Sequence, residues 1–181
     1  MTVAKMSDNK PLKNTLPDTR ALGLVNTCRF KVRTIEDVEV VAQFAAHIFG
    51  DPSRIQPGLQ ALMLNAVEHG CLGVGGELKA QLMEQGTWAD EIRRRQSLPE
   101  NRQRFANIII ARKKDGIYTV IQDPGQGFDW RKWLSVDPTR ANLSYGRGIA
   151  LARSMSFDGL TYNPAGNQVV AHSRDMADIE W

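Results

Sequence analysis

Three polar side chains interrupt an otherwise apolar segment, LMLNAVEHG, at positions 62–70: Asn65, Glu68 and His69. If the segment is helical, Asn65 and His69 share a face with Ala61, because residues four apart are neighbours on a helix surface. A carboxamide inside a helix is costly to bury without a partner, and its oxygen suits a Mg²⁺ ion that also carries phosphate oxygens and water. Alternatively, Asn65 bonds to a neighbouring loop and His69 interacts with the end of its own helix.

A second segment, DPGQGF at 123–128, directly follows the apolar run IYTVIQ. Asp123 ends an expected strand, and the glycines at 125 and 127 allow the backbone to approach a flat ligand closely. Asp123 can then accept a hydrogen bond from an exocyclic amine of that ligand. A turn closed by the aspartate side chain would account for the same residues.

A third segment, YGRGI at 145–149, opens an expected helix. Backbone N–H groups at the start of a helix bind phosphate, and Arg147 adds a positive charge next to Gly146 and Gly148. The chain has neither the Gly-Lys-Ser/Thr of a P-loop nor the G-x-G-x-x-G of a dinucleotide-binding fold. The alternative is that the two glycines form a hinge.

Hydrophobic periodicity and turn residues predict the elements that must position these three segments. The expected order is an edge strand at 27–34, helices at 35–51 and 57–70, a charged helical insertion at about 76–104 broken at Gly86, two strands within 105–125, a helix at 147–157 and two strands within 159–174. Lys114-Asp115-Gly116 and Asn163–Gly166 are expected to turn two β-hairpins. This order predicts an α+β fold, a two-layer α/β sandwich with a mixed, mostly antiparallel sheet and its helices on one face.

The length of 181 residues suits one domain with its own core. We expect a polar, basic, partly disordered tail at 1–26, a folded domain at 27–175 and a short C-terminal tail at 176–181. The first 33 residues carry a net charge of +5, and the rest of the chain carries −2. Because nucleic-acid-binding domains carry positive charge on their folded part, we expect no nucleic-acid partner.

Two further classes of protein are excluded by the pattern of apolar residues. No apolar run approaches the roughly 18 residues that span a bilayer, so we expect no membrane association. The N-terminal segment lacks the apolar core of a secretory signal. Cys28 and Cys71 match no metal-ligand spacing and no disulfide framework, so reduced thiols and a cytoplasmic location are expected.

Taken together and in this order, the three polar segments resemble the asparagine box and the two glycine boxes of the GHKL ATPase superfamily, which includes gyrases, heat-shock chaperones, histidine kinases and MutL proteins. The resemblance extends over about residues 27–174. NAVEHG, DPGQGFDW and GRGIALA are most similar to anti-sigma-factor serine/threonine kinases, small ATP-binding regulators of bacterial sporulation and stress responses. The resemblance therefore implies the Bergerat ATP-binding fold, with ATP and Mg²⁺ as ligands.

The resemblance also implies a role for individual residues. Asn65 would hold Mg²⁺ between the ATP phosphates, Asp123 would accept from the adenine amino group, and residues 131–145 would form a mobile lid. Asn167, after Gly166, replaces a threonine that the family often has near adenine. The residues implied to bind ATP are Asn65, His69, Asp123, Gly125, Gly127, Gly146, Arg147, Gly148 and Asn167.

The sequence departs from the family at the position of the general base. Family members that hydrolyse ATP or transfer its phosphate usually have Glu four residues before the asparagine, where this chain has Ala61. A positioned base contributes about 10²- to 10⁴-fold to the rate. Glu68 has a similar azimuth but lies almost two turns further along, so it is a candidate base only for a substrate that approaches differently.

Three functions follow from the resemblance. The chain is a serine/threonine kinase acting on an anti-sigma antagonist, or a catalytically weak ATP-binding module that sequesters a sigma factor or another regulatory partner, or the catalytic domain of a histidine kinase. The third is disfavoured, because His47 is not followed by an acidic residue and no long helical hairpin precedes it. Relatives of this type commonly form homodimers.

The insertion also has two interpretations. Trp88 and the run Arg93-Arg94-Arg95 can form a surface for a protein partner. Alternatively, the insertion is a solvated helical arm that packs through Leu78, Leu82 and Trp88.

Overall fold

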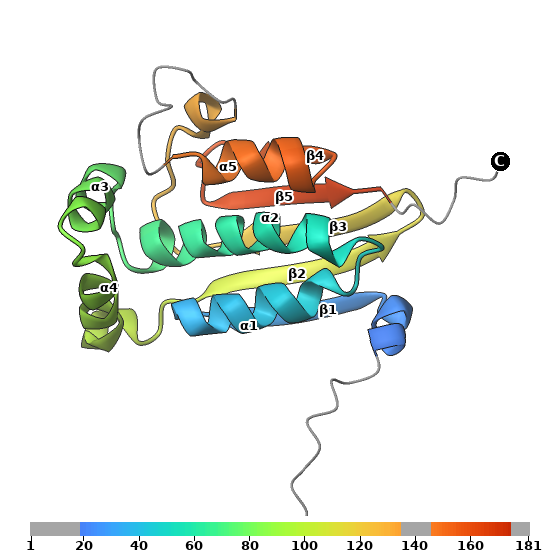
Figure 1. The fold of residues 1–181 in the computed structure, drawn as a ribbon, viewed down its shortest axis with the longest axis horizontal. Coiled ribbons are helices and arrows are strands. Elements are labelled where there is room, and N and C mark those ends of the chain that lie inside the picture. The colour runs from blue at the N-terminus through green and yellow to red at the C-terminus, as the bar shows by residue number, and fades with distance from the viewer. Residues whose placement is uncertain (1–18, 135–145, 175–181) are drawn as a thin grey trace, which may run out of the picture.

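The computed structural model describes residues 19–134 and 146–174. This part of the chain is an α+β protein with five α-helices and one open, five-stranded sheet of order β1-β2-β3-β5-β4 (Figure 1). The strands are β1 Thr27–Val32, β2 Ala106–Lys113, β3 Gly116–Gln122, β4 Gly159–Tyr162 and β5 Gln168–Ser173.

All four pairings between the described strands are antiparallel. The mixed sheet expected from the sequence is therefore wrong in its parallel part, whereas both predicted hairpins are confirmed. The first turns tightly, with Lys113 opposite Gly116, and Gly116 has a φ of +141° that favours glycine. The second joins β4 to β5 through Asn163–Gly166, where Gly166 has a φ of +85°.

Three helices cover one face of the sheet: α1 Ile35–Ala46, α2 Pro52–Asn65 and α5 Gly148–Leu151 (Figure 1). Two of them continue without a break into wide π-helical turns, α2 into η2 Ala66–Cys71 and α5 into η6 Ala152–Ser156. Alternate residues of β2 and β3 are buried on the face that these helices cover, and Ile108 and Ile110 belong to the same core cluster as Leu59 of α2. Burying one isoleucine or leucine side chain contributes about 1.5–3 kcal/mol to the stability of the fold, so these residues hold the helices firmly against the sheet.

The second helix begins five residues earlier than its sequence pattern predicts. Asp51 caps it by accepting a hydrogen bond from the backbone N–H of Arg54, and Pro52 occupies the first turn, where a missing N–H has no cost. Pro57 therefore lies inside the helix instead of at its start.

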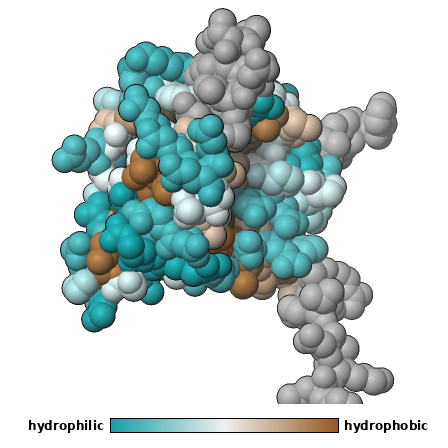
Figure 2. All heavy atoms as spheres, turned by 60° about the vertical axis from the view of Figure 1, so that its left-hand side comes forward, coloured by the Kyte–Doolittle hydropathy of each residue, from teal (hydrophilic) through white to brown (hydrophobic). Residues whose placement is uncertain are grey.

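The insertion forms two helices, α3 Gly76–Glu84 and α4 Trp88–Ser97, which lie at one end of the sheet (Figure 1). The chain turns between them at Gly86, which has a φ of +68°, and the break predicted at this glycine is confirmed. The molecule's surface on this side is largely hydrophilic, with small separate hydrophobic areas (Figure 2). The arginine run is engaged within the arm: Arg93 pairs with Asp90, and Arg94 and Arg95 pair with Glu91.

Other parts of the chain carry short 3₁₀ helices. One, η1 Thr19–Leu24, falls within the segment 1–26 that the sequence analysis expects to be a tail, and the others are η3 Pro99–Asn101 and η4 Trp130–Trp133. Across residues 19–134 and 146–174, none of the helices has the length and apolarity needed to cross a bilayer.

Candidate functional site

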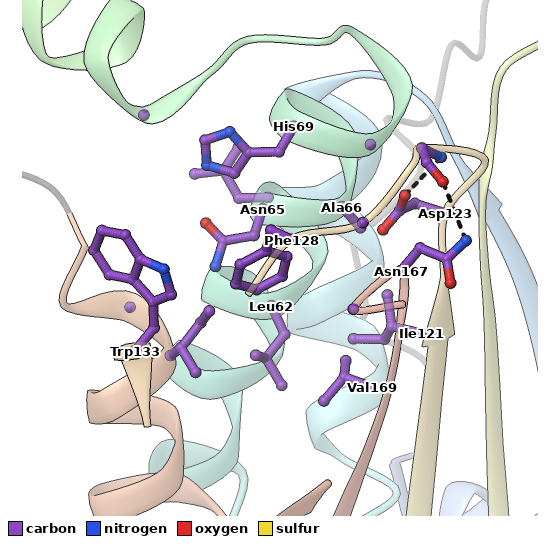
Figure 3. Close-up of a pocket in the computed structure, with 18 of the residues that line it drawn as sticks. Leu62, Asn65, Ala66, His69, Ile121, Asp123, Phe128, Trp133, Asn167 and Val169 are labelled. Carbon is purple, nitrogen blue, oxygen red and sulfur yellow. Dashed lines mark hydrogen bonds between the residues drawn. The ribbon is translucent and has the colours of Figure 1, made fainter. Parts of the chain in front are cut away.

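A cavity of about 680 Å³ lies between the α2–η2 helix, the end of β3, the start of β5 and the start of α5. This volume is in the usual range of about 300–1,000 Å³ for small-molecule sites. All nine residues that the sequence analysis assigns to ATP line it: Asn65, His69, Asp123, Gly125, Gly127, Gly146, Arg147, Gly148 and Asn167. Figure 3 shows Asp123 and Asn167 on one side of the cavity and Asn65, His69 and Trp133 on the other.

Asp123 supplies a carboxylate to the end of the cavity where it lies with Asn167, opposite Asn65. Its Oδ1 accepts a hydrogen bond from the backbone N–H of Gly125 at 2.8 Å, which leaves Oδ2 as the second acceptor of the carboxylate. Burial raises the pKa of Asp123, although the Gly125 N–H and the nearby His69 and Arg104 oppose this rise. A desolvated carboxylate with one oxygen fixed by the backbone is well placed to accept a hydrogen bond from a ligand amine.

Glycine at position 70 is required by the close approach of this carboxylate. A Cβ on Gly70 would lie 2.1 Å from Asp123 Cγ, and a Cβ on Gly125 would lie 2.8 Å from Asp123 Oδ1. The α2–η2 helix, which carries Asn65, therefore contacts the loop after β3 at Gly70 and Gly125. The sequence predicts a role for Gly125 but none for Gly70, because Gly70 is required by a contact with Asp123, which is distant in the sequence.

We expect the Gly70→Ala variant to lose stability and to displace the Asp123 carboxylate. Overpacking of this kind costs about 1–3 kcal/mol, which lowers the Tm of a chain of this size by about 2–12 °C. Thermal unfolding of the variant measures the effect. In the control variant Gly50→Ala the new Cβ meets nothing within 4 Å, so its Tm should change by less than about 2 °C. Equal Tm values for the two variants would contradict the role of Gly70.

Asn167 holds the Asp123 loop in place. Its Nδ2 donates to the Gly125 carbonyl at 3.1 Å (Figure 3), and its Oδ1 accepts from Asn163 Nδ2 at 2.8 Å. The nearby Gly127 has a φ of +83°, and a Cβ there would lie 1.9 Å from the carbonyl oxygen of Ala165. Asn167 thus lines the cavity as expected, but its amide is hydrogen-bonded to the loop that carries Asp123.

The opposite end of the cavity is formed by α2 and α5. Within the described part of the chain, the Asn65 carboxamide has no hydrogen-bond partner, so both its donor and its acceptor are available to a ligand. A Cβ on Gly148 would lie 3.4 Å from Ala61 Cβ and 3.9 Å from Asn65 Nδ2. The start of α5 is therefore next to the asparagine, with Arg147 lining the same end.

Trp133 closes this end from the side of η4. Its ring lies against Gly146, where an added Cβ would come within 2.3 Å of Cζ3, and Gly146 has a φ of +81°. The expected lid, residues 131–145, is described only as far as Leu134, and its remainder lies outside the described residues.

The structure does not support Glu68 as a base. Its side chain is 0% exposed, it is not among the described residues that line the cavity, and both carboxylate oxygens are engaged. Oε2 accepts from Lys79 Nζ at 2.5 Å, and Oε1 accepts from Trp88 Nε1 at 2.8 Å. Because the π-helical turn and the insertion helices enclose it, Glu68 is a structural anchor.

Several cavity residues had no role predicted from the sequence, namely Lys79, Arg104, Phe128 and Tyr162. Arg104 donates to the carbonyls of Gly70 and Cys71 at 2.9 and 2.7 Å and joins the end of η2 to the loop after Asn101. Phe128 follows the DPGQG segment directly, which was an available signal. Lys79 and Arg104 belong to the insertion and carry no local pattern that points to a site.

The cavity offers few protein ligands for a magnesium ion. The described residues contain no group of three or more His, Cys, Asp or Glu side chains that could hold a metal. Mg²⁺ is commonly bound by one or two protein oxygens together with substrate phosphates and water, and the Asn65 carboxamide fits that mode. A metal here would therefore depend on a phosphate-bearing ligand.

No family model, no curated protein and no solved structure matches this chain.

Proposed function

We propose that the chain is an ATP-binding regulatory domain of the GHKL type with a Bergerat ATP-binding fold, similar to the anti-sigma-factor kinases. Adenine occupies the Asp123 end of the cavity, and the phosphates with Mg²⁺ occupy the end at Asn65 and Gly148. Asp123 accepts from the adenine amine. Arg147 and the start of α5 receive the phosphates.

One observation carries the proposal. Asn65, Asp123 and Gly146 lie 58 and 23 residues apart in the sequence. Their three segments nevertheless supply an unpartnered carboxamide, a carboxylate and a glycine–arginine helix start to a single cavity. A purely structural role for each segment does not require that they meet. The antiparallel sheet with α1, α2 and α5 on one face supports the same assignment.

A second observation favours ATP binding over efficient phosphoryl transfer. Ala61 lines the cavity where the family's glutamate base would stand, and Glu68 is buried in its bonds to Lys79 and Trp88. Among the described residues lining the cavity, Asp123 is the one carboxylate. We therefore propose a catalytically weak module that acts by binding a protein partner, such as a sigma factor or an anti-sigma antagonist, as a monomer or a homodimer.

The histidine-kinase alternative receives no support from the geometry. His47 is exposed at the C-cap of α1, a helix of 12 residues, so it does not lie on a long helical hairpin.

We expect Mg·ATP to raise the Tm of the wild-type protein. At a ligand concentration of 100 Kd the stabilisation is about 2.7 kcal/mol, which corresponds to a rise of about 5–11 °C for a chain of this size. Asn65→Ala should reduce this rise strongly in Mg²⁺ and less in EDTA, because Asn65 acts on the metal–phosphate end. Thermal unfolding with and without millimolar Mg·ATP measures both effects, and an unchanged wild-type Tm would contradict the proposal.

A further inference from the structure

The buried Glu68 joins the asparagine helix to both helices of the insertion. It belongs to η2, whereas Lys79 belongs to α3 and Trp88 to α4. The ion pair with Lys79 and the hydrogen bond from Trp88 use both carboxylate oxygens. Glu68, Lys79 and Trp88 thus link the helix that lines the cavity to the two insertion helices, α3 and α4.

Lys79 differs from the other two members of the cluster because it also lines the cavity. Its side chain is 17% exposed, while that of Glu68 is fully enclosed. Figure 3 shows α3, the helix that carries Lys79, on the side of the cavity with His69 and Asn65 and away from Asp123, so Lys79 belongs to the Asn65 end. An ammonium group has three N–H donors, and Glu68 Oε2 accepts from one of them.

The two ends of the cavity also differ in charge. The guanidinium of Arg104 is bonded to the carbonyls of Gly70 and Cys71, beside Asp123. Two further cations line the cavity, Arg147 at the start of α5 and Lys79 on α3. A triphosphate brings more negative charge to the Asn65 end than a diphosphate does, so it attracts the Lys79 ammonium group more strongly.

We propose that Lys79 is a phosphate-binding residue supplied by the insertion. It keeps its ion pair with Glu68, donates a second N–H to the terminal phosphate when ATP is bound, and so makes the position of α3 and α4 depend on the nucleotide. This inference rests on the proposed ATP site. It assigns to the insertion a role in distinguishing ATP from ADP. Trp88 remains bonded to Glu68 and reports the change.

The decisive comparison is between Glu68→Gln and the double variant Glu68→Gln/Lys79→Met. A lone Lys79→Met change would leave Glu68 as an uncompensated buried charge and would destabilise the fold. Glutamine keeps an acceptor for Trp88 and removes that charge, so the two variants differ only in the ammonium group. Isothermal titration in Mg²⁺ with ATP, ADP and adenosine measures the affinities, with Lys113→Met as a control for the loss of one exposed positive charge.

We expect ATP to bind the double variant about ten- to a hundredfold more weakly than it binds Glu68→Gln, since one charge-assisted contact is lost. The ADP affinity should change less, and the adenosine affinity should stay the same. In wild-type protein labelled with 5-fluorotryptophan, the ¹⁹F resonance assigned by Trp88→Phe should shift more with ATP than with ADP.

Equal ATP affinities in the two variants would overturn the role of Lys79 and leave the proposed ATP site intact. An equal loss of adenosine affinity would also overturn it, because that loss would reflect general damage to the cavity. Failure of the wild-type protein to bind any of the three ligands would remove the ATP site and this inference together.

Discussion

In the Asp123→Asn variant we expect Mg·ATP to leave the Tm unchanged, whereas it raises the Tm of the wild-type protein. The Gly125 N–H fixes one carboxylate oxygen of Asp123, and the asparagine oxygen takes over that bond. The remaining atom of the side chain becomes an NH₂ group, which faces the adenine amine with a donor instead of an acceptor. Thermal unfolding at a fixed Mg·ATP concentration tests this.

The same substitution should leave the nucleotide-free protein at least as stable as the wild type at neutral pH. Burial raises the pKa of Asp123, so the folded state binds this proton more tightly than the unfolded chain does. The stabilisation from this group is therefore fully present below the unfolded pKa and is lost as the pH rises through the raised folded pKa. At pH 7 the ionised carboxylate costs stability, and a neutral asparagine removes that cost.

The control for Asp123→Asn is Asp90→Asn, which changes an exposed carboxylate on α4 that pairs with Arg93. This variant should keep the full Mg·ATP response. A nucleotide-free Asp123→Asn protein that melts well below the wild type would show that the carboxylate stabilises the fold, and would contradict the reasoning from its pKa.

The second large effect is expected from Ala61→Glu, which should create or strongly increase ATP hydrolysis or phosphorylation of a partner. Ala61 lines the cavity four residues before Asn65 and faces the start of α5. A glutamate there extends into the cavity and supplies a proton acceptor beside the phosphates, for which the expected gain is about 10²- to 10⁴-fold. Release of phosphate from ATP over hours measures the change.

Ala61→Gln is the matched control, because it has nearly the same size as glutamate and is no base. It should bind ATP without the gain in turnover. Rapid hydrolysis by the wild-type protein that Ala61→Glu does not increase would show that a base acts from elsewhere in the chain.

The elements that carry the site were predictable because their signals are local. Lys114-Asp115-Gly116 indicates a hairpin whatever the rest of the chain does, since a tight turn needs residues with those backbone preferences. Residues spaced like Ala61 and Asn65 share a helix face in any helical context. Where local signals competed, the prediction failed in detail: Pro57 suggested a helix start, but Asp51 and Pro52 begin the helix earlier.

The sequence by itself determined which chemical groups are present, the order in which the chain supplies them, and the helices and strands that hold them. Only the tertiary structure decided which groups meet. Glu68 is the clearest case, because its partners Lys79 and Trp88 lie 11 and 20 residues further along the chain and turn a candidate base into a buried anchor. The contact between Gly70 and Asp123 is another case. Only after η2 has packed against the loop that follows β3 is it clear that position 70 must be glycine. Periodicity and turn chemistry act over a few residues, whereas burial and desolvation depend on what the packed elements bring from elsewhere.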